Sequence, residues 1–228
     1  MKARISVWWG GAALAFGVFV RITRELIEGD VGTMDISILL AVAKTRTPWR
    51  TIVAIDVTAL GSTPVVVLFS AVAFVALLVL RDRLGALQLL AASVGAGVLT
   101  FVTKNFIERI RPESAQQLVA VSGFSYPSGH SLLSAALYLT IAIIAGRYVR
   151  RFRARAAIFM AVSAIPVLVG ASRVYLGVHY MTDVVSGIFL GSGWALLLAG
   201  FFAIKSRRQQ NPGSAGIAPF SNPGSRQQ

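Results

Sequence analysis

The chain has 228 residues, of which 55% are hydrophobic and only 14% are charged, whereas about a quarter of the residues of a soluble domain carry a charge. This imbalance, with a mean hydropathy of +0.70, indicates that lipid rather than water surrounds much of the protein. The formal net charge is +13, but the basic residues are spread among apolar segments and form no nucleic-acid-binding motif, so no nucleic-acid partner is expected. Cysteine is absent, which excludes disulfides and thiolate metal sites.

Six apolar segments approach the roughly 17–25 residues that a helix needs to cross a bilayer. They show no period-2 alternation, so strands of a membrane barrel are a poor alternative. The first segment follows two basic residues and resembles a signal peptide, but no clear cleavage site follows it, which predicts an uncleaved transmembrane helix. The predicted spans are residues 5–22, 62–80, 86–104, 130–146, 156–172 and 182–204.

The segment between the first two spans, residues 23–61, is too polar to be a further span. Its short apolar stretches predict one or two short helices that lie in the membrane interface, with Trp49 at the level of the headgroups. The tail, residues 206–228, is rich in Gln, Ser, Gly, Pro and Asn and is predicted to be disordered. The predicted fold is therefore all-α: one domain, residues 1–205, built as an integral membrane bundle of six transmembrane helices.

The distribution of basic residues predicts the orientation of this bundle. With a cytoplasmic N-terminus, the inner segments are residues 1–4, 81–85, 147–155 and the tail with the adjoining Lys205, which together hold thirteen of the 22 lysines and arginines. Residues 147–155 contain five arginines and no acidic residue, so the positive-inside rule places them, and with them both termini, in the cytoplasm. Nine basic residues fall on the outer side against this trend, among them Lys104, Arg109, Arg111 and Arg173.

The first of three polar motifs lies at the outer end of the third span. Lys104 and Arg111 are seven residues apart, two helical turns, so they are expected to share one face of the helix. Pro112 disfavours the helical conformation at Arg111 and is expected to end the helix there. A basic pair at a helix end more often reaches toward lipid headgroups, so this motif alone does not define a site.

The second motif, Tyr126-Pro-Ser-Gly-His130, comes directly before the fourth span. Ser128 is a natural N-cap, and Gly129 and His130 then occupy the first helical turn. Free backbone N–H groups and the helix dipole favour an anion at that position, and a histidine there can also donate a proton. The alternative is a purely structural helix cap.

The third motif runs from Ser172 and Arg173 to His179 and Asp183. His179 and Asp183 are four residues apart, so on a helix their side chains are neighbours. A carboxylate that accepts the imidazole Nδ1–H fixes the tautomer and leaves Nε2 as a nucleophile or base. Asp183 also opens an apolar span, where an ionisable group is costly and usually functional. The alternatives are a cap for Asp183 and an interfacial position for His179.

Both histidines of the chain fall within these motifs, and all three motifs map to the outer side of the membrane. Phosphoryl transfer needs such a set of groups: fixed cations for the equatorial oxygens, an activated nucleophile and an acid for the leaving oxygen. No cluster of carboxylates suited to magnesium, calcium or zinc accompanies them. We therefore expect neither a metal ion nor another cofactor.

The three motifs resemble the signature of the type 2 phosphatidic acid phosphatase superfamily, which includes lipid phosphate phosphatases, bacterial phosphatidylglycerophosphate and undecaprenyl pyrophosphate phosphatases, and vanadium haloperoxidases. That signature is a lysine, six residues and Arg-Pro; then Pro-Ser-Gly-His; then Ser-Arg, five residues, His, three residues and Asp. Residues 104–112, 127–130 and 172–183 match it without departure. The resemblance implies dephosphorylation of a membrane lipid phosphate or pyrophosphate, without metal, through a phosphohistidine.

The resemblance also implies roles for individual residues. His179 would attack phosphorus with Asp183 orienting it, and His130 would protonate the leaving oxygen. Ser172 would be a supporting hydrogen-bonding residue. The groups that would hold the phosphoryl oxygens are Lys104, Arg111, Arg173, Ser128 and the backbone N–H of Gly129.

The sequence leaves the substrate and the acceptor open. Phosphatidic acid, phosphatidylglycerophosphate, undecaprenyl pyrophosphate and phosphorylated lipid A all present a terminal phosphoryl group, and a hydroxyl acceptor in place of water would make the protein a phosphotransferase. A small membrane transporter or a structural protein is an alternative of another class, although no pair of similar halves with broken helices is visible. The expected location is a bacterial plasma membrane, with an extracytoplasmic active site. The sequence predicts no oligomeric state.

Overall fold

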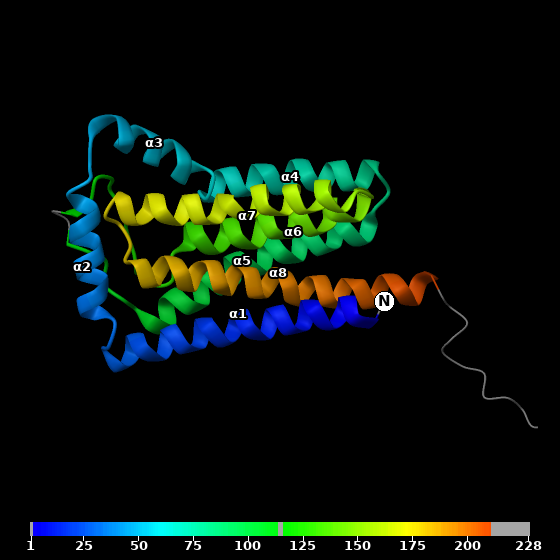
Figure 1. Cartoon of the computed structure of the whole chain (residues 1–228), viewed down its shortest axis with the longest axis horizontal. Coiled ribbons are helices and arrows are strands. Elements are labelled where there is room, and N and C mark those ends of the chain that lie inside the picture. Colours follow the sequence, from blue (N-terminus) through cyan, green and yellow to red (C-terminus); the bar gives the residue numbers. More distant parts are fainter. Residues whose placement is uncertain (1, 114–115, 211–228) are drawn as a thin grey trace, which may run out of the picture.

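The computed structural model describes residues 2–113 and 116–210 of the chain, and within these residues it contains eight helices and no strand. Six of the helices run side by side along one axis and form an elongated bundle (Figure 1). The prediction of an all-α membrane bundle is confirmed. The helices of the bundle are α1 (Lys2–Glu28), α4 (Thr63–Val79), α5 (Arg83–Ile107), α6 (Gly129–Tyr148), α7 (Phe152–Tyr175) and α8 (Met181–Gln210).

Five of these helices are long and apolar enough to cross a membrane individually. Helix α4 passes the same test of length and apolarity only together with the preceding helix α3 (Pro48–Ala59), which meets α4 at an angle of 45°. Helix α8 continues to Gln210, so residues 206–210, predicted to belong to a disordered tail, are helical. The rest of that predicted tail lies outside the described residues.

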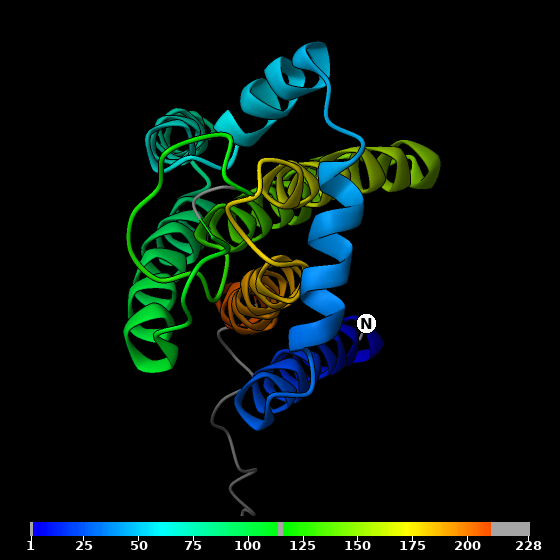
Figure 2. The same cartoon turned by 90° about the vertical axis from the view of Figure 1, so that its left-hand side faces the viewer.

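Two short helices, α2 (Gly32–Ala43) and α3, occupy the segment between the first two spans, as predicted. Figure 2 shows that α2 lies across one end of the bundle. Pro48 stands in the first turn of α3, where its missing N–H leaves no hydrogen bond unmade. Trp49 follows it and is 63% exposed, in keeping with a side chain at headgroup level.

Helix α6 is the centre of the bundle and packs against α4, α5, α7 and α8. Its closest neighbour is α8, because two glycines of α8 face the backbone of α6. A β-carbon at Gly187 would lie 2.6 Å from the carbonyl oxygen of Ser128, and one at Gly191 would lie 2.3 Å from that of Leu132. Small residues of this kind let membrane helices approach closely.

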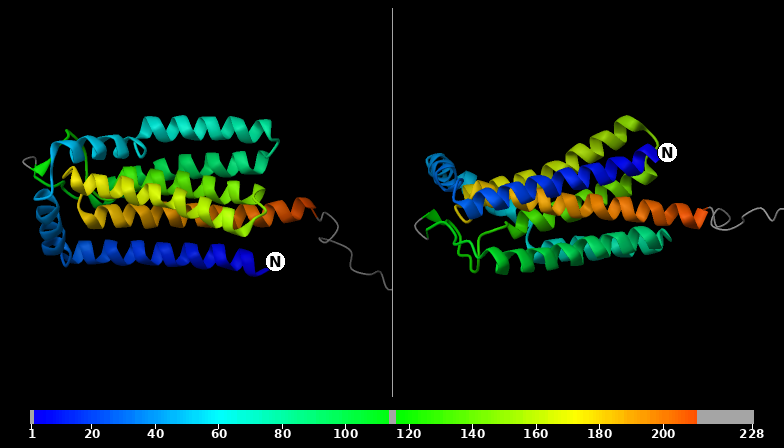
Figure 3. Two further views of the ribbon diagram at one scale, coloured as in Figure 1. Left: turned by 45° about the horizontal axis from the view of Figure 1, so that its top comes forward. Right: turned by 90° about the horizontal axis from the view of Figure 1, so that it is seen from below.

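The two ends of the bundle carry different parts of the chain. One end holds α2, α3 and the loops 108–128 and 176–180, whereas α1 begins and α8 ends at the other, together with the loops 80–82 and 149–151 (Figure 3). All three polar motifs therefore lie at the same end. The arginine-rich residues 147–155 lie at the opposite end.

Candidate active site

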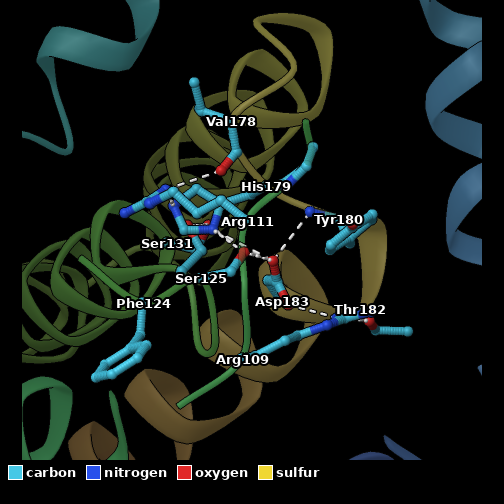
Figure 4. A network of polar contacts seen from close by, with 12 residues as sticks. Arg109, Arg111, Phe124, Ser125, Ser131, Val178, His179, Tyr180, Thr182 and Asp183 are labelled. Carbon is cyan, nitrogen blue, oxygen red and sulfur yellow. Dashed lines mark hydrogen bonds and ion pairs between the residues drawn. The ribbon is translucent and has the colours of Figure 1, made fainter. Parts of the chain in front are cut away.

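The three motifs converge where the long loop 108–128 meets the first turns of α6 and α8 (Figure 4). Both histidines belong to this cluster, and His130 interacts electrostatically with His179. The predicted residues come from six elements: Lys104 from α5, Arg111 from the loop 108–128, Ser128, Gly129 and His130 from the start of α6, Ser172 and Arg173 from the end of α7, His179 from the loop 176–180 and Asp183 from the first turn of α8.

Asp183 is fully buried, and both of its carboxylate oxygens are hydrogen-bonded. Oδ1 accepts a hydrogen bond from Nη1 of Arg109 at 2.6 Å. Oδ2 accepts hydrogen bonds from the backbone N–H of Tyr180 at 2.9 Å and from the hydroxyl of Ser125, and it lies 3.3 Å from Nδ1 of His179. A buried carboxylate is stable only with such compensation, so Asp183 remains an anion that faces the imidazole.

The imidazole of His179 is 2% exposed and lies between Asp183 and Arg111. Burial lowers the pKa of His179 to about 4, although Asp183 acts in the opposite direction, so the ring is neutral at pH 7. We place its single proton on Nδ1, because that atom faces a carboxylate. Nε2 then carries the lone pair, and it lies 3.1 Å from Nη1 of Arg111.

Arg111 is held in place by backbone carbonyl groups of two loops. Its Nε donates to Gly123 at 2.9 Å, its Nη1 to Val178 at 2.8 Å and its Nη2 to Ser122 at 3.2 Å. Burial lowers the pKa of Arg111, and Asp183 opposes this effect; a guanidinium stays charged in proteins. A rigid cation is thus fixed beside Nε2 of His179.

The expected helical face shared by Lys104 and Arg111 is wrong. Helix α5 ends at Ile107, because Glu108 adopts a left-handed conformation with φ of 51°. Arg111 therefore belongs to the loop rather than the helix. The loop nevertheless brings Arg111 close to Lys104, and the two cations interact electrostatically. Nζ of Lys104 also donates a hydrogen bond to the carbonyl of Phe124 in this loop.

Arg173 is buried at the end of α7, where its Nη1 donates to the hydroxyl of Thr58 at 3.1 Å. Its Nε is also buried but has no hydrogen-bond partner among the described residues. Buried polar groups are nearly always hydrogen-bonded, so this donor is available to an anion. Ser172 points elsewhere, since its hydroxyl donates to the carbonyl of Val169 in its own helix at 2.6 Å.

Ser128 stands at the N-cap of α6 as predicted, but its hydroxyl makes no capping hydrogen bond. It accepts a hydrogen bond from Ser131 Oγ at 3.0 Å instead, while its backbone N–H donates to the backbone carbonyl of Asp183 at 2.9 Å. A β-carbon at Gly129 would lie 3.8 Å from Cε of Lys104. The first turn of α6 therefore lies beside both the carboxylate motif and the α5 cation.

Sequence reasoning did not select several residues that complete this cluster. Arg109 was noted only as a cation on the outer side, yet it forms ion pairs with Asp35 at 2.7 Å and with Asp183 at 2.6 Å. Ser125 directly precedes the second motif and bonds Asp183. Nothing in the local sequence signals these contacts, because Asp35 and Arg109 are distant from Asp183 along the chain. Within residues 2–113 and 116–210, no three His, Asp or Glu side chains gather in a group that could hold a metal ion.

The fold and the site together define a class: a multi-pass, all-helical membrane protein whose polar centre combines a neutral imidazole, a second histidine and fixed cations. Such a centre suits the binding and transfer of a phosphoryl group. Residues 85–207 match the PAP2 superfamily, and the chain belongs to this family.

Known phosphatases resemble the chain over between about half and about four fifths of its length. Phosphatidylglycerophosphatase B of Bacillus subtilis is 34% identical over 191 residues, covering 82% of this chain and 92% of that protein. Lipid A 1-phosphatase of Rhizobium johnstonii is 33% identical over 119 residues, covering 48% of this chain and 45% of that enzyme. The crystal structure of the first transmembrane PAP2 type phosphatidylglycerolphosphate phosphatase from Bacillus subtilis superposes with a TM-score of 0.78 and 32% identity, over 83% of this chain and 94% of that one.

Proposed function

We propose that the chain, a membrane lipid phosphatase by its family, removes the terminal phosphoryl group of a lipid through a covalent phosphohistidine on His179. The observation that carries this proposal is the environment of His179: Nδ1 lies 3.3 Å from Asp183 Oδ2, and Nε2 lies 3.1 Å from a fixed guanidinium. A neutral ring with an unprotonated Nε2 is a nucleophile, and the adjacent cation attracts the phosphoryl oxygens to it.

In the first step, Nε2 of His179 attacks phosphorus in line and the bond between phosphorus and the lipid oxygen breaks. His130 gives its proton to that leaving oxygen, which departs as an alcohol or as a lipid monophosphate. Asp183 stabilises the positive charge that develops on the His179 ring. The phosphoryl oxygens are held by the side chains of Lys104, Arg111, Arg173 and Ser128 and by the backbone N–H of Gly129. Ser172 supports Arg173 indirectly, because its hydroxyl bonds the backbone of the same helix, α7.

In the second step, a water molecule attacks the phosphorus of the phosphohistidine. His130, now neutral, takes a proton from this water, and the phosphorus–nitrogen bond breaks to release inorganic phosphate. His179 returns to its neutral form and His130 is protonated again, so atoms and charges balance over the cycle. Because arginine and lysine supply the positive charge, the reaction needs no metal ion.

We favour phosphatidylglycerophosphate as the first substrate to test, because the relative that this chain matches over 92% of the relative's length is named phosphatidylglycerophosphatase B. Phosphatidic acid and undecaprenyl pyrophosphate present the same terminal group and belong in the same panel. The test is phosphate release from each lipid by the protein in detergent, with a metal chelator present. Activity should survive the chelator and disappear in His179→Ala, and rapid acid-free quenching should trap phosphate on the wild-type protein only.

Two results would overturn this mechanism: an active His179→Ala variant, or loss of activity on chelation. A phosphotransferase would instead be revealed if a phosphorylated acceptor, such as glycerol phosphate, formed in place of free phosphate. The same quench experiment serves both cases, since each passes through the same phosphohistidine.

We further propose that the active site faces the outside of a plasma membrane, because the five arginines of residues 147–155 lie at the opposite end of the bundle. The chain has no cysteine, so single cysteines can be introduced without a background. Asp30→Cys lies at the end that holds the site, and Arg151→Cys lies at the other. In intact cells, a membrane-impermeant thiol reagent should modify only Asp30→Cys; the reverse pattern would invert the orientation.

A further inference from the structure

A single arginine joins the interfacial helix α2 to the site. Nη2 of Arg109 lies 2.7 Å from Oδ2 of Asp35 in α2, and Nη1 lies 2.6 Å from Oδ1 of Asp183. The side chain of Arg109 is 12% exposed and both carboxylates are fully buried. Burial would lower the pKa of Arg109, but the two carboxylates outweigh this effect and raise it, so the guanidinium is a permanent cation between two anions.

Asp35 and Arg109 also hold two residues that closely precede the catalytic carboxylate in the chain. The backbone N–H of Thr182 donates to Oδ1 of Asp35 at 3.1 Å, and the hydroxyl of Thr182 is hydrogen-bonded to Oδ2. The guanidinium carbon of Arg109 lies 4.2 Å from the centre of the Tyr180 ring. The chain from residue 180 to residue 183 is therefore clamped from one side by a helix that lies outside the bundle.

Stability alone is a weak explanation for this arrangement. Burying two carboxylates and a guanidinium requires removing all three from water, and buried ion pairs often contribute little net stability compared with apolar residues of similar size. The geometry has a more specific consequence. Arg109 donates a hydrogen bond to Oδ1 of Asp183, so the carboxylate cannot rotate without losing this ion pair. Oδ2 therefore stays directed at Nδ1 of His179.

We propose that Arg109 and Asp35 are positioning residues of the active site: they hold the Asp183 carboxylate in the orientation that serves His179, and they make α2 part of the catalytic framework. This inference rests on the function proposed above. It assigns a role to a helix whose other contacts are sparse, since α2 packs only lightly on α7 and α8 and exposes Met34, Ile36 and Leu40.

The charge on Arg109 should also influence the acid limb of the pH profile. His179 faces Asp183 on one side and Arg111, Arg173 and His130 on the other. Removing the cation from Oδ1 leaves the Asp183 charge less compensated, which stabilises the protonated imidazole. The pKa of His179 then rises, and the acid limb moves to higher pH. A contact that only supported the fold would leave this limb where it is.

The test compares Asp35→Asn, Arg109→Gln and their combination with Asp30→Asn, a matched control that neutralises an exposed carboxylate two residues before α2. Misplacing a catalytic group can lower the rate by about 100-fold. We expect kcat to fall by about 10- to 100-fold in both single variants with KM nearly unchanged. Because both residues act through one contact, the double variant should be no slower than Arg109→Gln. Asp30→Asn should match the wild type.

Arg109→Lys guards against a variant that fails to fold, since a lysine keeps the charge but cannot bridge two carboxylates. It should keep the wild-type acid limb and recover part of kcat. The proposal is overturned if folded Asp35→Asn has the wild-type kcat, or if kcat falls in Arg109→Gln while its acid limb stays unchanged. If His179→Ala is inactive while Asp35→Asn is normal, only this inference fails; if His179→Ala is active, the proposed function itself fails.

Discussion

The backbone N–H of Ser128 donates to the backbone carbonyl of Asp183 at 2.9 Å, and this bond joins the first turn of α6 to the first turn of α8. His130 follows Ser128 closely, and His179 precedes Asp183 by one turn. The carbonyl of Ser128 also touches α8, since a β-carbon at Gly187 would lie 2.6 Å from it. The relative placement of the two imidazoles thus depends on one close helix crossing.

Widening this crossing should therefore affect both stability and activity. In Gly191→Ala the new methyl group would lie 2.3 Å from the carbonyl oxygen of Leu132. Overpacking of this kind lowers stability by about 1–3 kcal/mol, which a thermal unfolding curve in detergent would detect. Gly97→Ala is the matched control, because nothing lies within 4 Å of a β-carbon there. Equal unfolding temperatures for the two variants would contradict the close crossing.

Asp183→Asn should slow phosphate release by at least about 100-fold, within the range that acid–base groups contribute. The carboxylate now accepts hydrogen bonds at both oxygens, and an amide has only one oxygen to offer. Its NH₂ group must then face either Arg109 or His179. Facing His179, it forces the proton to Nε2 and removes the nucleophile. Quenched-flow measurement should find less phosphohistidine; an unchanged amount would exclude this role.

The pH dependence of kcat/KM should show an acid limb near pH 4, because burial lowers the pKa of His179 to about 4. The sign follows from the nucleophile: attack needs neutral Nε2, so His179 is reactive above this pKa and loses its reactivity as the pH falls through it. Below about pH 4, kcat/KM should drop about tenfold for each pH unit. A limb near 6.5, the value of a free imidazole, would show that Nε2 is in contact with water.

His130→Ala should discriminate between leaving groups. A general acid contributes about 10²–10⁴-fold when the leaving oxygen needs a proton. Release from a lipid phosphate should fall by about this factor, whereas p-nitrophenyl phosphate, whose leaving group departs as an anion, should lose much less. An equal loss with both substrates would mean that His130 binds the phosphoryl group rather than protonating the leaving oxygen.

Much of the fold was predictable, because a helix that crosses a bilayer needs a long segment of apolar residues that is visible in the sequence. A continuous apolar run of fixed length has few alternatives in lipid, so the six spans and the interfacial segment follow directly from hydropathy. The site motifs were also accessible, since His179 and Asp183 are close in sequence and two histidines in a chain of this length are conspicuous.

What escaped prediction depends on conformations and contacts between distant segments. Glu108 takes a left-handed conformation that ends α5 before Arg111, and a rule based on Pro112 alone places this end too late. The hydroxyl of Ser128 prefers Ser131 to the cap position. The contact between Asp35 and Arg109 exists only after α2 has folded over the end of the bundle, so no spacing along the chain could reveal it.

Helix α1 begins, and α8 ends, at the pole of the bundle that lies farthest from the loops around His179. A fluorescent protein or an affinity handle fused ahead of α1 would therefore lie at the end of the bundle opposite the loops around His179. The enzyme could be immobilised on a solid support through such a fusion with its substrate-facing surface left open, which makes turnover by surface-tethered single molecules practicable.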